Sequence, residues 1–163
     1  MTGIREVNPE TDLEAITEIY RWYVENTTAT FELDPLTPES MLRRIEEVAP
    51  NFPYLVWENE GEILGYCYAH TWKKYPAYDI TLETTIYLRP EETGCGIGKK
   101  LMQRLIGECR ESRYGSLIAC ITAENTGSCR FHENLGFRKV SHFHGVGMKF
   151  GCLLDVEDYQ LIL

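Results

Sequence analysis

The glycine-rich segment Thr93-Gly94-Cys95-Gly96-Ile97-Gly98-Lys99 carries the clearest chemical signal in the sequence. Its three alternating glycines precede a stretch with helical periodicity, so bare backbone N–H groups and the positive end of a helix would face a bound anion. The pattern therefore predicts a phosphate-binding loop. A Walker A loop needs Ser or Thr where Lys100 stands, and a dinucleotide fingerprint starting at Gly94 needs glycine where Lys99 stands, so neither motif fits.

A second polar segment, from Asn125 to Phe137, follows about thirty residues later. Asn125 and His132 are seven residues apart, which is about two helical turns, so both point to one face of a helix. Asn125 also fits a plain helix N-cap. A single histidine on a helix is more often a surface or core residue than a catalytic one, and the residues alone leave both interpretations of His132 open.

Glu83 is a carboxylate within the β-branched and apolar segment 80–88. Period-two alternation makes a solvent-facing strand residue the ordinary interpretation. The alternative is a catalytic carboxylate that acts as a general base. The strand pattern alone does not decide between them.

Helical and strand-like segments alternate along the chain, which indicates an α/β or α+β fold. Hydrophobic periodicity, caps and turns predict strands over 3–7, 53–59, 62–71, 80–88, 116–122, 137–146 and 152–162. They predict helices from Asn8-Pro9 through Tyr23, over 37–48, over 96–113 and over 125–135.

Composition narrows the class of protein. The chain has 163 residues, a formal net charge of −9 and six scattered cysteines without a CxxC pair. We expect one domain over 1–163, reduced thiols, and no nucleic-acid or membrane partner, because phosphate surfaces select basic proteins. No targeting or membrane segment is evident, and a cytoplasmic location is expected.

The two polar segments together resemble the GNAT acetyltransferase superfamily. The loop is similar to the family's Arg/Gln-x-x-Gly-x-Gly/Ala motif, with Thr93 departing at the first position. Asn125-x-x-Ser128 with Leu135-Gly136-Phe137 resembles the family's next helix. Segment 77–88 resembles phosphinothricin and methionine sulfoximine acetyltransferases, as do 28–32, 43–47 and 147–155, so the likeness covers nearly the whole chain.

The resemblance implies a GNAT fold, a mixed and largely antiparallel sheet with helices on both faces. It implies acetyl-CoA as cosubstrate and direct attack of an amine, with Glu83 as base and His132 as auxiliary acid or base. Backbone groups of Ile86, Tyr87 and Leu88, at a bulge in their strand, would contact the acetyl and pantetheine groups. The other implied cofactor contacts are Gly94, Cys95, Gly96, Ile97, Gly98, Lys99, Asn125 and Asn134.

The acceptor pocket implied by the resemblance contains Glu83, Phe31, Trp72, Lys73, Pro76, Ala77 and Tyr78. Lys73 stands where the subfamily often has arginine, and lysine grips a carboxylate only as a point charge. A small amino-acid-like amine is expected as acceptor and a homodimer as assembly. His142 and His144 can share a strand face, but no third ligand is evident, and no metal site is expected.

Two alternatives to a small-molecule acetyltransferase stay open. A protein or peptide amine acetyltransferase would need an open groove rather than a closed acidic pocket. A CoA-binding regulatory module without turnover would not need both Glu83 and His132.

Overall fold

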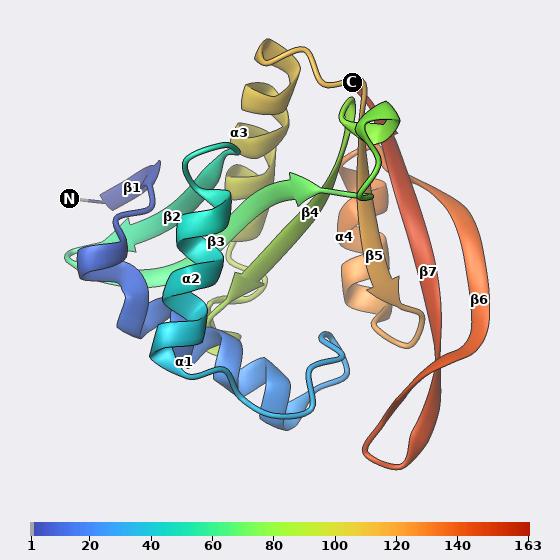
Figure 1. Cartoon of the computed structure of the whole chain (residues 1–163). Helices are drawn as coiled ribbons and strands as arrows, with labels where there is room; N and C mark the ends of the chain where they lie inside the picture. The colour runs from blue at the N-terminus through green and yellow to red at the C-terminus, as the bar shows by residue number, and fades with distance from the viewer. Residues whose placement is uncertain (1) are drawn as a thin grey trace.

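A single seven-stranded sheet runs through the computed structural model, which describes residues 2–163 (Figure 1). Its strands are β1 (Thr2–Glu6), β2 (Tyr54–Asn59), β3 (Glu62–Thr71), β4 (Thr81–Leu88), β5 (Ser116–Thr122), β6 (Arg138–Lys149) and β7 (Cys152–Ile162). The order across the sheet is β1-β2-β3-β4-β5-β7-β6. Only the β4–β5 pair is parallel, so the sheet is mixed and largely antiparallel, as predicted.

Helices cover both faces of this sheet. They are α1 (Pro9–Asn26), α2 (Pro38–Val48), α3 (Ile97–Glu111) and α4 (Thr126–Asn134), with short 3-10 turns at Pro76–Tyr78 and Pro90–Glu92. One hydrophobic cluster joins α1 and α2 to one face, for example through Ile16 and Ile45. A second cluster places Leu101 and Leu105 of α3 on the opposite face, where α4 also packs (Figure 1).

Local signals explain several element boundaries. The Asn8 side chain caps α1 by accepting from the Glu10 N–H, and the Thr37 side chain caps α2 by accepting from the Ser40 N–H. The hairpin β2–β3 turns at Glu60 and Gly61, both with positive φ. The predicted hairpin and the predicted α2 are confirmed, whereas α3 ends at Glu111, earlier than expected, and β6 continues to Lys149.

Strands β4 and β5 diverge, and this divergence leaves a gap in the sheet between them. They pair only from Thr81 to Glu83 against Ser116 to Ile118, although β4 continues to Leu88 and β5 to Thr122. Beyond Glu83, the β4 edge that faces β5 therefore lacks a ladder partner within the described residues. Backbone groups on this edge are therefore open to a ligand, except the Leu88 carbonyl oxygen, which accepts from the Tyr23 hydroxyl at 2.7 Å.

Across residues 2–163, no helix combines the length and the apolar character that crossing a membrane requires.

Candidate active site

A cavity of about 830 Å³ lies between the diverging strands. Its walls include β4, the C-terminal half of β5, the glycine loop before α3, and α4. Among the residues expected from the sequence, those that line it are Phe31, Glu83, Ile86, Tyr87, Leu88, Gly94, Gly96, Gly98, Lys99, Asn125, His132 and Asn134. Segments far apart in the sequence thus meet around one space of ligand size.

Glu83 stands at the point where β4 and β5 separate. Its register partners are His70 on β3 and Ile118 on β5. Burial, together with the nearby carboxylate of Asp158, raises the pKa of Glu83 to about 6. A carboxyl group with this pKa is ionised at neutral pH and is a better proton acceptor than an exposed glutamate.

His132 is 4% exposed and lies on the α4 wall of the cavity. Its Nδ1 is 2.8 Å from the Ser128 carbonyl oxygen, which can only accept, so Nδ1 carries the hydrogen. Burial lowers the pKa of His132. The neutral ring therefore leaves the Nε2 lone pair free to accept a proton.

The glycine loop has the backbone that the sequence predicted. Gly94 and Gly96 have φ values of 81° and 85°, in the left-handed region, and a Cβ on either would meet no atom within 4 Å. Gly96 is also the N-cap of α3. The N–H groups at this helix end therefore border open cavity space, which suits a pyrophosphate.

Gly98 is a glycine for a different reason. A Cβ there would lie 3.3 Å from Leu88 Cδ1 and 3.5 Å from Phe131 Cε2, so the helix packs closely on β4 and α4. Of the remaining loop residues, Ile97 is buried in the core and Cys95 is exposed, and neither side chain lines the cavity.

The open edge of β4 does not come from the bulge that was expected from the sequence. The β3–β4 register runs without a shift from Gly65↔Leu88 to Thr71↔Leu82, so the expected bulge at 86–88 is wrong. The divergence from β5 frees the backbone instead. A local pattern could not show this, because it depends on how far two distant strands stay paired.

The expected acceptor residues of the β3–β4 connection form their own cluster. Lys73 Nζ lies 4.3 Å from the Trp72 ring centroid and 5.1 Å from the Tyr78 ring centroid. None of Trp72, Lys73, Pro76, Ala77 and Tyr78 lines the cavity, although this loop enters β4 at the end that carries Glu83. Their role in acceptor binding stays a prediction.

Several residues that line the cavity were not expected from the sequence, and two of them, Arg130 and Cys120, bear on its chemistry. Arg130 of α4 lines the cavity together with Lys99, and a cation beside a predicted phosphate loop was a usable signal. Cys120 lines it next to Glu83, and no local signal marked it. Burial, together with the carboxylates of Asp158 and Glu83, raises the pKa of the Cys120 thiol to about 12.

Comparison with known proteins agrees with this geometry. Residues 16–137 match the model of the Acetyltransferase (GNAT) family. The chain belongs to this family.

Individual relatives cover almost the whole chain. A phosphinothricin N-acetyltransferase of Streptomyces viridochromogenes is 33% identical over 95% of this chain and 86% of its own length. An L-methionine sulfoximine/L-methionine sulfone acetyltransferase of Salmonella typhimurium is 35% identical over 93% of this chain and 90% of its own. The crystal structure of a phosphinothricin acetyltransferase from Sinorhizobium meliloti in complex with AcCoA superposes with a TM-score of 0.95, at 36% identity, over 99% of this chain and 88% of that one.

Proposed function

We propose that this protein transfers the acetyl group of acetyl-CoA to the primary amine of an amino acid or a close analogue, such as methionine sulfoximine. The observation that carries the proposal is the shared cavity, in which Glu83, the free β4 edge and the glycine loop face one another. The named relatives acetylate compounds of this kind.

The residues around the cavity fit acetyl-CoA. Left-handed glycines at 94 and 96 let backbone N–H groups approach a pyrophosphate, and Lys99 and Arg130 add positive charge. The edge of β4 at Ile86 to Leu88 has no pairing with β5, and its open backbone groups can bond the pantetheine amides as a strand would. Asn125 caps α4 by accepting from the Ser128 N–H, which leaves its amide N–H groups free for the pantetheine arm, and Asn134 lies further along α4.

Proton transfer follows from the two titratable groups. Glu83, through a water molecule, accepts a proton from the substrate ammonium, which leaves a nitrogen lone pair for attack on the thioester carbonyl. The C–N bond forms and the C–S bond breaks. His132 Nε2 accepts the second proton of the attacking nitrogen and returns it to the departing thiolate.

Direct transfer suits the cavity better than a cysteine intermediate. Cys120 is the thiol beside Glu83, but its pKa of about 12 keeps it protonated at neutral pH. The thiolate is the reactive form of cysteine, so this residue is a poor nucleophile.

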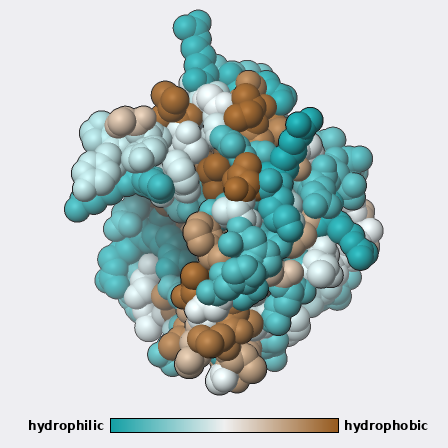
Figure 2. All heavy atoms as spheres, turned by 90° about the vertical axis from the view of Figure 1, so that its right-hand side faces the viewer, coloured by the Kyte–Doolittle hydropathy of each residue, from teal (hydrophilic) through white to brown (hydrophobic). Residues whose placement is uncertain are grey.

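We further propose that residues 1–163 form one cytoplasmic domain that assembles as a homodimer. Strand β6 is an edge of the sheet, and it and β7 expose apolar side chains at Val140, Phe143, Val146, Met148 and Leu153. Figure 2 looks onto this side of the molecule and shows apolar patches among polar atoms. Unprotected edges and apolar patches are typical of an assembly surface.

The homodimer is tested by light scattering during gel filtration. We expect a mass twice that of the 18.8-kDa chain. Phe143→Glu should convert the dimer into monomers, because a charge would then be buried in the interface. A monomeric wild-type protein would contradict the proposed assembly.

A thiol-release assay with a panel of amines tests the proposed function. We expect turnover with methionine sulfoximine and methionine sulfone, and slower turnover with phosphinothricin, because Lys73 offers a single point charge where the subfamily often has a forked arginine. Lys73→Arg should raise phosphinothricin turnover more than methionine sulfoximine turnover.

The same panel separates the alternatives. Activity on peptide N-termini or lysines without activity on free amino acids would favour a protein acetyltransferase. Tight acetyl-CoA binding with no thiol release for any amine would favour a regulatory module.

His132→Phe tests the second proton carrier. We expect a smaller loss of kcat than for substitution of Glu83, because His132 acts after the amine has been deprotonated. The loss should persist at high pH, since solution cannot replace a group that serves the leaving thiolate. A loss that disappears as pH rises would instead indicate that His132 helps to remove the first proton, the one on the substrate ammonium.

A further inference from the structure

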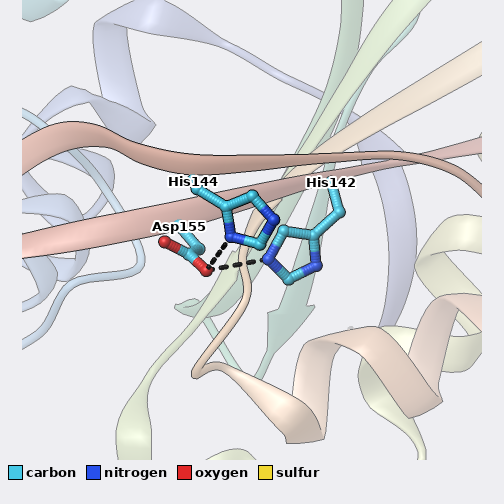
Figure 3. A group of neighbouring side chains, drawn as sticks. All are labelled: His142, His144 and Asp155. Carbon is cyan, nitrogen blue, oxygen red and sulfur yellow. Dashed lines mark hydrogen bonds and ion pairs between the residues drawn. The ribbon is translucent and has the colours of Figure 1, made fainter.

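Two histidines of β6 and one aspartate of β7 converge outside the cavity. One ligand atom of each of His142, His144 and Asp155 lies within 4.8 Å of the other two. His142 Nε2 is 2.8 Å and His144 Nδ1 is 3.1 Å from the same carboxylate oxygen, Asp155 Oδ2 (Figure 3). The third group that the His142-x-His144 spacing lacked is therefore supplied by the neighbouring strand.

Glu157 orients one of these imidazoles. Its Oε1 lies 2.8 Å from His142 Nδ1, on the opposite side of the ring from Asp155. A carboxylate that accepts from Nδ1–H fixes the tautomer in which the Nε2 lone pair is free for a metal, and this arrangement recurs around protein-bound zinc. Glu157 is itself held by Lys139 Nζ at 3.0 Å and the Tyr159 hydroxyl at 2.9 Å.

Asp155 is also held in place. The Gly145 N–H donates to Asp155 Oδ1 at 2.8 Å, so its second oxygen, Oδ2, stays directed at the two rings. Gly145 has a φ of 58° and lies where the β6–β7 register shifts between Phe143 and Gly147. His142 and His144, two residues apart on β6, share one side of the strand, and the Gly145 N–H holds the Asp155 carboxylate beside them.

Charge at this cluster favours a cation. Once both imidazoles are neutral, as metal ligation requires, the two negative charges of Asp155 and Glu157 and the one positive charge of Lys139 leave the group negative. The His144 side chain is 82% exposed, which leaves room for a water molecule as fourth ligand. Two imidazole nitrogens and a carboxylate oxygen with one open position suit a tetrahedral zinc ion.

We propose that His142, His144 and Asp155 bind one Zn²⁺ ion, which clasps β6 to β7 across their register shift. The ion takes the place of the hydrogens that now join both rings to Asp155, and Glu157 keeps the hydrogen on His142 Nδ1. The clasp is separate from acetyl transfer. Glu83 pairs with Ile118, and Ile118 pairs with Gln160, so these three side chains lie on one face of the sheet. Asp155 and Glu157 are an odd number of residues from Gln160 along β7, so the proposed zinc site lies on the opposite face.

Isothermal titration of the metal-free protein with Zn²⁺ tests the proposal, with Co²⁺ as a coloured probe of ligand geometry. We expect one ion per chain, visible Co²⁺ bands of tetrahedral type, and a higher melting temperature with Zn²⁺. His142→Ala/His144→Ala should abolish all three effects. Glu157→Gln should weaken Zn²⁺ binding by ~10- to 100-fold while the Co²⁺ bands persist.

Two control variants exclude other metal ligands. Cys152→Ser removes an exposed thiol of β7, and His70→Ala removes an imidazole of β3, and both should bind Zn²⁺ as the wild type does. Equal binding by the wild type and the double histidine variant would overturn the proposal. Absence of stoichiometric binding by a folded wild-type protein would overturn it as well.

Discussion

Replacing Glu83 with glutamine is expected to lower kcat by ~10²- to 10⁴-fold near neutral pH, which is the usual contribution of a positioned base. Glutamine keeps the shape of the side chain but cannot accept a proton. An α-amine with a pKa of ~8 is mostly ammonium at neutral pH, so the reaction then needs the base. The deficit should shrink above pH ~8, where solution deprotonates the amine.

The Glu83→Gln protein should stay folded and bind acetyl-CoA normally. The raised pKa of Glu83 means that the folded state disfavours its ionised form, so removing the charge should leave the melting temperature at neutral pH unchanged or raised. Glu111→Gln, which changes an exposed carboxylate at the end of α3, is the matched control and should retain wild-type kcat. Near-normal turnover of Glu83→Gln at neutral pH would reduce Glu83 to an ordinary strand residue.

Replacing Gly96 with valine is expected to raise the KM for acetyl-CoA far more than the KM for the amine. Gly96 lines the cavity at the start of α3, where the pyrophosphate is proposed to lie, and a valine side chain there would take up space at that wall. A β-branched residue is also strained at a φ of 85°, so the loop would lose the conformation that presents its N–H groups. Steady-state kinetics with each substrate varied in turn measures the effect.

Gly107→Val is the matched control for this substitution. Gly107 lies within α3, where a Cβ would also meet no atom within 4 Å but where φ is not in the left-handed region. We expect near wild-type KM values for both substrates. Equal effects of Gly96→Val on the two KM values, or no effect on either, would contradict a phosphate-binding role for the loop.

Much of the fold could be predicted because local chemistry fixes its elements. Thr37-Pro38 carries both the cap and the favoured first residue of α2, and that helix begins and ends where the sequence indicates. The apolar run from Ser116 to Thr122 predicted β5, and Gly136, with a φ of 96°, ended the segment that contains α4. Caps, turns and periodicity act over a few residues, so they can be read from the sequence.

The site was only partly predictable, because it depends on strand pairing over long distances. Glu83 and the loop glycines were found in the sequence, but the early divergence of β4 and β5 was not, and a bulge was wrongly expected instead. Cys120 reaches the cavity only through that divergence. Asp155 meets the two histidines because β7 pairs with β6, with Glu157 opposite His142, and no local spacing reveals that pairing.

The pH dependence of kcat/KM for methionine sulfoximine, measured from about pH 5 to about pH 10, tests the role of Glu83 most directly. This parameter reports groups of the free enzyme and the free substrate. The wild type should show an inflection at about 6, where protonation of Glu83 removes the base, and another at ~8 for the amine. Glu83→Gln should lose the lower inflection and keep the upper one. Profiles with the same inflections in both proteins would contradict Glu83 as the base.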